Sequence, residues 1–298
     1  MKTKLEDILS DDSDLVYHYT TREAALEHIL HDRKLRLSKL SRATDPFESL
    51  FGKNPLGVTA NISEEEIHLL SWAMDMVDRE RNIFKDSSWF VSFCMSQSNR
   101  PTDGKNPDIK DRLGFLKARM WDQYGQGFKG VCLAFSKSDL QKEAKSKSHW
   151  KCFCENLSYV PHHQLPMNDV QKACEKKKRL KDAYTFESFF DDRYQLLYFL
   201  KHQDFRDEDE WRICVTDEKV DNEYIFLDCG SALRAICYCH DHENQQMPEL
   251  FPSAYIPLMK SHSETFEVPI IEIAWTERDI SAFFMNPEKN FEHEEMLF

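Results

Sequence analysis

The sequence contains few glycines, and this scarcity argues against two common classes of nucleotide-binding protein. Only 8 of its 298 residues are glycine. Neither a G-x-G-x-x-G stretch nor a G-x-x-x-x-G-K-[ST] stretch occurs. Rossmann dinucleotide folds and P-loop nucleotide hydrolases use those glycine-rich loops to bring the backbone close to phosphates. Both classes therefore lose their main support.

The chain also lacks long apolar runs. Residues 1–7, Met-Lys-Thr-Lys-Leu-Glu-Asp, do not form the apolar core of a signal peptide. No stretch approaches the ~20 apolar residues that a membrane helix needs. The 9 cysteines are an odd count scattered along the chain, which favours reduced thiols over a disulfide framework. We therefore expect a cytoplasmic protein with no membrane partner.

The composition indicates a globular protein. Hydrophobic residues make up 41% of the chain and include 21 Phe, which is ample for a sizeable core. The net charge of −13 opposes non-specific adhesion to nucleic acid or anionic membranes. No Pro/Gly/Ser-rich linker divides the chain. We expect a single domain over residues 1–298, with its core at about 15–275 and helical insertions near 60–87 and 165–202.

Strand-like and helical segments are interleaved irregularly. Apolar patterns predict strands at 15–20, 35–38, 88–96, 130–135, 149–160, 210–216, 223–227, 232–239 and 268–275. A capping box at Thr20-x-x-Glu23 predicts a helix after the first strand, and charged helices are predicted at 111–124 and 137–147. The neighbouring late strands favour an α+β domain with a mixed or mostly antiparallel sheet and flanking helices.

Two polar clusters lie on predicted strands that are far apart along the chain. His18 lies in the strand at 15–20, where it shares a face with Thr20, as a common ligand would require. Glu208 and Glu210 enter the strand at 210–216. Each cluster also has an ordinary explanation. A histidine on a strand is often a structural residue without a ligand. An acidic run at the start of a strand is often exposed to solvent, and here Arg212 could pair with one of its carboxylates.

Four stretches of the chain, in this order, resemble the bacterial DUF2971 family. They are Tyr17-His18-Tyr19-Thr20 followed by a helix and Leu35-Arg36-Leu37-Ser38; Thr44-Asp45-Pro46-Phe47-Glu48; Met120-Trp121-Asp122-Gln123-Tyr124 running into Lys129–Phe135; and Glu208-Asp209-Glu210-Trp211-Arg212-Ile213. The resemblance spans roughly residues 15–275. Thr44 stands where that family usually has Asn.

That family in turn resembles the ADP-ribosyltransferase fold, in particular its diphtheria-toxin-like branch, which uses a His, a Tyr and a Glu. The resemblance implies a split, twisted sheet with an NAD cleft between its halves. It implies that His18, with the neighbouring hydroxyls of Tyr19 and Thr20, binds the adenosine-side ribose and diphosphate of NAD. Glu210 would then bond the nicotinamide ribose. Glu208 would align the acceptor, as the first Glu of a Glu-x-Glu pair does in arginine-directed transferases.

An aromatic side chain would stack on the nicotinamide ring, and the resemblance leaves Trp121 and Tyr124 as candidates for it. The two are also typical of core packing at a helix end. Ser92 and Ser96 resemble the serine-bearing strand of the other transferase branch. Cleavage of the nicotinamide–ribose bond develops oxocarbenium character, which a carboxylate on the 2-hydroxyl stabilises. The reaction requires no metal.

The sequence therefore predicts an NAD-dependent ADP-ribosyltransferase, or an NAD glycohydrolase, with NAD as substrate and an unidentified protein or nucleic acid as acceptor. A toxin-like effector, for example in phage defence, is the expected setting. Two alternatives stay open. A metal-dependent nuclease would hold a divalent cation with Asp45, Glu208 and Glu210, although no catalytic lysine stands near Glu210 in the sequence. A non-catalytic partner-binding protein would keep the fold without the chemistry.

Two further patterns can mislead. Cys152-x-Cys154 and Cys237-x-Cys239-His240-x-His242 resemble metal motifs, but their spacing is poor for zinc, so we expect no metal and small buried thiols instead. The basic run at 176–181 is typical of a solvated helix face, and phosphates of a polynucleotide or of NAD are the alternative partners.

Overall fold

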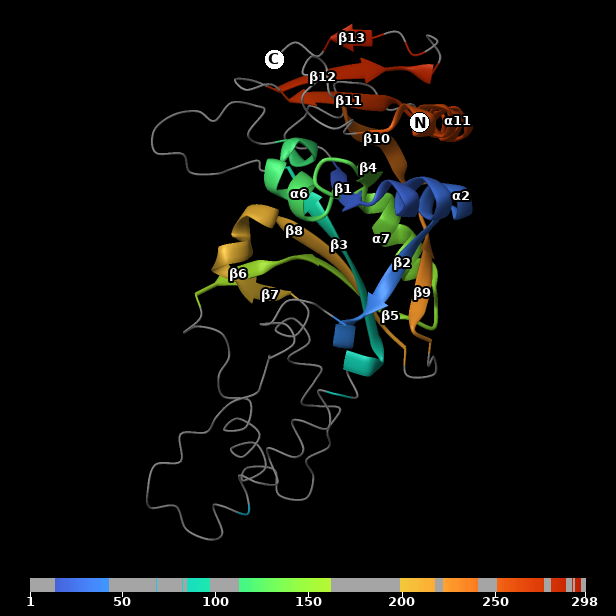
Figure 1. The fold of residues 1–298 in the computed structure, drawn as a ribbon. Helices are drawn as coiled ribbons and strands as arrows, with labels where there is room; N and C mark the ends of the chain where they lie inside the picture. Colours follow the sequence, from blue (N-terminus) through green and yellow to red (C-terminus); the bar gives the residue numbers. More distant parts are fainter. Residues whose placement is uncertain are drawn as a thin grey trace.

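A computed structural model describes residues 14–42, 68, 82, 85–96, 113–161, 199–217, 222–240, 251–275, 280–287, 291 and 293–295. Within these ranges the fold is α+β, with few helices around a largely antiparallel sheet (Figure 1). This confirms the predicted α+β class with a mixed, mostly antiparallel sheet, and the likeness to the ADP-ribosyltransferase fold stays a prediction. The expected helical insertions and the basic run fall almost entirely outside the described residues, and the single domain over 1–298 stays a prediction.

In the described part of the chain, eleven strands form one large sheet. They are β1 (Leu15–Thr20), β2 (Lys34–Lys39), β3 (Ser88–Met95), β4 (Val131–Ser136), β5 (Lys151–Asn156), β8 (Glu210–Thr216), β9 (Tyr224–Asp228), β10 (Leu233–His240), β11 (Ile270–Trp275), β12 (Ile280–Met285) and β13 (His293–Glu295). Among the described residues, the pair β10–β11 is parallel and the other pairs of this sheet are antiparallel. The predicted strand at 149–160 breaks at Leu157, because β6 (Ser158–Val160) pairs with β7 (Leu200–His202) in a separate parallel sheet.

The helical elements are short. They are η1 (Ala24–Ile29), α2 (Leu30–Asp32), η2 (Leu40–Arg42), η3 (Gly114–Leu116), α6 (Ala118–Gln123), α7 (Lys137–Ser146), η6 (Gln203–Glu208), η7 (Ser253–Tyr255) and α11 (Ile256–Phe266). The turn after β1 is capped by Thr21, whose Oγ1 accepts a hydrogen bond from the Ala24 amide at 3.2 Å. The cap is therefore Thr21 and not Thr20, and the predicted capping box does not form, because Ala24 follows Thr21 by three residues and Glu23 pairs with Arg22.

Hydrophobic cores lie on both faces of the strands around β4. Val131, Leu133 and Phe135 belong to one core, which also contains the apolar faces of η1, α7 and α11. Cys132 and Ala134 belong to the other core, with η3 and α6. All six residues of β4 are buried, as its nearly continuous apolar run predicts. Since successive side chains of a strand point to opposite faces, β1 contributes alternate residues to the two cores.

The sheet forks at β3. One edge of β3 pairs along its length with β8, from Ser88↔Thr216 to Cys94↔Glu210. The other edge is shared by two strands: β1 pairs with its residues 94–95, and β2 pairs with its residues 89–90. Residues 91–93 of β3 therefore face the gap where β1 and β2 diverge, and Figure 1 shows the two strands leaving β3 in different directions.

Gly130 allows the close approach of β1 and β4 beside this fork. A Cβ at position 130 would lie 2.2 Å from the Thr20 carbonyl oxygen and 2.9 Å from the Gly125 backbone. Gly130→Ala should therefore lower the free energy of unfolding by about 3 kcal/mol, measured by urea denaturation. Gly127→Ala is the control, since that position has open space but a φ of 60°, and it should cost only about 1 kcal/mol. Equal losses in the two variants would contradict this packing.

Candidate functional site

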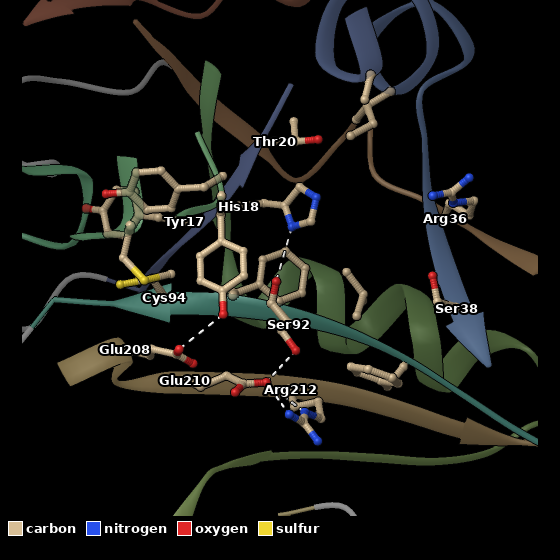
Figure 2. Close-up of a pocket in the computed structure, with 18 of the residues that line it drawn as sticks. Tyr17, His18, Thr20, Arg36, Ser38, Ser92, Cys94, Glu208, Glu210 and Arg212 are labelled. Carbon is tan, nitrogen blue, oxygen red and sulfur yellow. Dashed lines mark hydrogen bonds and ion pairs between the residues drawn. The ribbon is translucent and has the colours of Figure 1, made fainter. Parts of the chain in front are cut away.

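A cavity of about 760 Å³ opens at the fork of the sheet (Figure 2). Its walls come from β1, β2, β3, β7, β8 and β9, from η1, α2 and η6, and from Met120 and Tyr124 at α6 and just after it. The volume is in the range of small-molecule binding sites. Of the residues expected at the site, His18, Tyr19, Thr20, Tyr124, Glu208 and Glu210 line the cavity, and Trp121 does not. The tertiary structure therefore brings together the two polar clusters that are distant in the sequence.

His18 bridges the gap in the fork. Its Nδ1 lies 3.1 Å from the backbone carbonyl oxygen of Ser92, in the segment of β3 that neither β1 nor β2 covers. Because a carbonyl only accepts hydrogen bonds, Nδ1 carries the proton. Burial lowers the pKa of His18 and outweighs the opposite effect of the Ser92 carbonyl, so the imidazole is neutral near pH 7. Its Nε2 is then a hydrogen-bond acceptor with no partner among the described residues.

Glu210 lies in the wall of the cavity at the start of β8 and is only 4% exposed. Its Oε1 accepts hydrogen bonds from the Ser92 hydroxyl and from Arg212 Nε, the latter at 2.7 Å. Its Oε2 accepts one from Lys201 Nζ at 3.2 Å. Burial alone raises the pKa of Glu210, but the charges of Arg212 and Lys201 and the hydrogen bonds bring it below its usual value. Glu210 is therefore ionised at neutral pH.

Glu208 joins Tyr124 to the same network. Its Oε1 accepts a hydrogen bond from the Tyr124 hydroxyl at 3.1 Å, and its Oε2 accepts one from Lys201 Nζ at 2.8 Å. Burial, followed by the charge of Glu208, raises the pKa of Tyr124 to about 12, so the phenol stays protonated and donates. Lys201 thus lies between two buried carboxylates.

The backbone before β8 differs from what the sequence suggests. Glu208 would share a strand face with Glu210 only if the strand began before Glu210, but β8 begins at Glu210, and Asp209 ends η6 in a left-handed conformation with φ 42°. Lys117, just before α6, donates to the Asp209 carboxylate and to the Asp207 carbonyl. This contact fixes the turn, and Lys201 rather than strand geometry brings the two carboxylates together.

The two candidate aromatic residues, Trp121 and Tyr124, lie in different environments at the end of α6. Trp121 is fully buried, its Nε1 donates to the Phe115 carbonyl at 2.8 Å, and its ring packs edge-on against Tyr19. Tyr124 follows the last residue of α6 and is 44% exposed at the cavity. The expectation that Trp121 could stack on a ligand is corrected by this position, which makes it a core residue.

Tyr19 also differs from expectation. It reaches the cavity wall, but its hydroxyl donates to the Gly114 carbonyl at 2.6 Å on the core side of β1. The predicted hydroxyl partner of His18 is therefore Thr20, which lies on the same strand face and lines the cavity (Figure 2). Of the two serines on the predicted strand at 88–96, Ser92 donates a hydrogen bond to Glu210. Ser96 instead accepts one from the Gly114 amide at 2.9 Å.

Sequence reasoning missed Lys201, and it missed the link of Arg212 to the cavity. No catalytic lysine was expected near Glu210, yet Lys201 reaches both carboxylates from β7 and forms ion pairs with them. Arg212 pairs with Glu210, as the ordinary explanation of that strand entry anticipated. The only signal for Lys201 was its place shortly before the acidic run, which by itself indicates nothing about contact.

No metal centre is assembled by the residues that the structure describes, since they contain no group of three or more His, Cys, Asp or Glu side chains placed to hold an ion. Cys237 and Cys239 are buried on β10, and Cys152 and Cys154 lie on β5 with their sulfurs 3.6 Å apart. Asp45, which the nuclease alternative needs, and His242 lie outside the described residues.

The fold and the cavity thus define an α+β protein with a charged candidate ligand site at the fork of its sheet. The sequence model of one family, described as "Protein of unknown function (DUF2971)", matches residues 120–213. This range contains two of the four stretches quoted above, and it supports the resemblance to that family. Comparisons with curated proteins and with solved structures give no match. In the described part of the chain, no helix has the length and apolar character needed to span a membrane.

The lowered pKa of Glu210 predicts a pH-dependent contribution to stability. A carboxylate whose pKa is lower in the folded than in the unfolded state (about 4.3) stabilises the fold above about pH 5. That stability is lost as the pH falls through the folded-state pKa. The difference in free energy of unfolding between wild type and Glu210→Gln, from urea denaturation, should therefore shrink on going from pH 7 to pH 3. The difference for Glu143→Gln, which removes a partly exposed carboxylate on α7, should change less. A constant difference for Glu210→Gln would contradict an ionised Glu210.

Lys201→Met tests the buried charge network. It leaves Glu208 without a cationic partner among the described residues, and breaking such a pair typically costs 3–5 kcal/mol, so we expect a loss of about 4 kcal/mol at pH 7 by urea denaturation. Adding Glu208→Gln should restore part of this stability, because it removes the unpaired charge, while Glu210 keeps its ion pair with Arg212. A second loss on adding Glu208→Gln would contradict the network.

Proposed function

We propose that this protein binds NAD⁺ in the cavity and transfers its ADP-ribosyl group to a macromolecule, with water as the competing acceptor. The observation that carries this proposal is the convergence of His18, Ser92, Tyr124 and Glu210, from four separate segments of the chain, on one cavity. His, Tyr and Glu are the side-chain types that the resemblance to the diphtheria-toxin-like branch implies, and Figure 2 shows His18, Ser92 and Glu210 around a common space.

The charge of the cavity supports an anionic ligand. The chain carries a net charge of −13, yet the described residues that line the cavity include four cationic side chains and three acidic ones. Glu208, Glu210, Lys201 and Arg212 neutralise one another in ion pairs. The remaining Lys34 and Arg36 outweigh Asp32. An excess of positive charge in a concave site favours a ligand with phosphates.

His18 and Thr20 would hold the ribose and phosphate groups that lie between the nicotinamide and adenine rings of NAD. The neutral imidazole presents Nε2 as an acceptor, which suits a ribose hydroxyl. The side chain of Thr20 lies on the same strand face and can donate to a phosphate oxygen or accept from a hydroxyl. The bond between Nδ1 and the Ser92 carbonyl fixes the orientation of the His18 ring.

Glu210 would stabilise the reacting ribose. Its Oε2 accepts from Lys201 alone among the described residues, so this oxygen retains a lone pair for the 2-hydroxyl. Heterolysis of the bond between nicotinamide N1 and ribose C1 leaves the electron pair on nicotinamide, which departs neutral. The ribosyl cation then bonds to an acceptor heteroatom, and the acceptor releases a proton. The ionised carboxylate is worth most when the positive charge develops.

Tyr124 and Glu208 would position the leaving group. The exposed ring of Tyr124 is anchored by its hydroxyl on Glu208, so it offers a preoriented face for the nicotinamide ring. Both oxygens of Glu208 already accept hydrogen bonds, and the side chain is almost fully buried. We therefore assign Glu208 to positioning Tyr124 and Lys201, in place of the acceptor-aligning role that the Glu-x-Glu spacing suggests.

The proposal includes a biological setting. In it, the protein acts as a toxin-like effector that modifies a macromolecule or depletes NAD in the cytoplasm, as in antiviral defence. This setting rests on the resemblance to other bacterial members of the transferase fold, not on the cavity.

The proposal is tested by NAD turnover, using NAD labelled in the adenylate half and a cell lysate as the source of acceptors. Wild type should release nicotinamide, and Glu210→Gln should do so about 100-fold more slowly, because it removes the charge that stabilises the ribosyl cation. Glu143→Gln is the matched control, since it makes the same change on α7 away from the cavity, and it should retain full activity.

The outcomes separate the candidate activities. Label on protein or nucleic acid that disappears in Glu210→Gln establishes the transferase and identifies the acceptor class. Nicotinamide release without labelled macromolecule indicates a glycohydrolase. A folded wild-type protein that neither consumes nor binds NAD contradicts the proposal and leaves the nuclease, assayed with Mg²⁺ or Mn²⁺, and the partner-binding protein as candidates.

A further inference from the structure

Two exposed aromatic rings line the same cavity. Among the described residues, three large hydrophobic side chains are exposed: Tyr124 at 44%, Phe226 at 53% and Leu258 at 39%. Tyr124 and Phe226 both line the cavity, whereas Leu258 lies on α11 outside it. An aromatic ring that is left in water beside a cavity is well suited to stack against a planar ligand ring. Tyr124 accounts for only one such ring.

The two aromatic rings belong to opposite ends of the cavity. On β3, Cys94 pairs with Glu210, next to the Tyr124 end, whereas Phe90 pairs with Ser38 of β2. These positions are four residues apart, or about 13 Å along the strand. Phe226 lies one strand further out, on β9. The cavity therefore runs from the acidic pair, past His18 and Ser92, to the face of β2 and β9.

The far end of the cavity is basic. Arg36 of β2 pairs directly with Phe226 of β9, and Lys34 precedes it on the same strand face. The Arg36 guanidinium lies 4.5 Å from the centroid of the Tyr224 ring, a cation–π contact that holds it at the edge of the cavity. Figure 2 shows Arg36 and Ser38 across the cavity from His18. This end combines an exposed ring with cations, which are the groups that bind a nucleobase and its phosphates.

We propose that the face formed by β2 and β9 is the subsite for the adenosine diphosphate half of the dinucleotide, with adenine stacked on Phe226 and the diphosphate against Arg36 and Lys34. The inference rests on the proposed function and deepens it, because it assigns the direction in which the dinucleotide lies. The nicotinamide half then occupies the end that holds Tyr124 and the two glutamates. Phe226 and Arg36 select a ligand that has an adenine nucleotide beyond the reacting ribose.

The experiment measures the two halves of the ligand separately, by ligand-observed NMR titration with ADP and with nicotinamide. Phe226→Leu should weaken ADP binding about tenfold (~1.4 kcal/mol), because it keeps an apolar side chain but removes the stacking face. Phe226→Trp should retain ADP binding. Arg36→Gln should also weaken ADP binding about tenfold and reduce its dependence on salt. Neither Phe226→Leu nor Arg36→Gln should change nicotinamide binding more than twofold.

Leu258→Ala serves as the control for removal of an exposed apolar side chain, and it should bind both ligands like wild type. Thermal unfolding of each variant verifies the fold. If ADP binds Phe226→Leu and Arg36→Gln as tightly as wild type, the assignment of this subsite is wrong. It is equally wrong if these variants lose nicotinamide binding and keep ADP binding, since that result would place the dinucleotide in the opposite direction in the cavity.

The same data distinguish this inference from the proposed function. A protein that binds ADP through Phe226 and Arg36 but does not consume NAD retains the subsite and contradicts the transferase. A protein that consumes NAD with unchanged ADP binding in both variants retains the transferase and contradicts the subsite. A wild-type protein that binds neither ADP nor nicotinamide contradicts both.

Discussion

The cavity exists because β1 and β2 compete for a single edge of β3. β8 occupies the other edge completely, so β1 and β2 can only pair at opposite ends and diverge between them. The unpaired stretch of β3 would leave a backbone carbonyl without a partner, and His18 takes that position at Ser92. One hydrogen bond thus satisfies the Ser92 carbonyl, selects the tautomer of His18 and leaves its second nitrogen as an acceptor.

The second constraint is charge. Two glutamates in a nearly buried wall would repel each other and lose hydration, and Lys201 and Arg212 offset both penalties. The same cations reduce the field that Glu210 can direct at a developing positive charge. In the proposed reaction, the ion pairs of Glu210 with Lys201 and Arg212 therefore keep its carboxylate ionised and rigid but make it less basic. Rigidity is the larger gain, because a preorganised group needs no rearrangement when the charge forms.

The cavity combines two chemically different ends within one acidic protein. Tyr124, Glu208 and Glu210 form an end that is neutral overall once Lys201 and Arg212 are counted, while Arg36 and Lys34 make the other end basic. His18 and Thr20 lie between them. A long ligand with a ring at each end and phosphates between fits this distribution better than a compact one, and this polarity is the physical basis of both proposals.

The sequence by itself determined the local elements, because strand alternation and helix caps depend on neighbouring residues. It predicted β1, β3, β4 and β8, the α+β class, and His18, Thr20 and Glu210 as polar positions on strands. It could not decide between Trp121 and Tyr124, since that choice depends on α6 ending at Gln123 and turning Trp121 into the core. Only the tertiary structure decided the fork of the sheet, the approach of His18 to Ser92 and the place of Lys201 between the two glutamates. Each of these depends on strand register over long sequence separations, and register carries no local signal in the residues that it brings together.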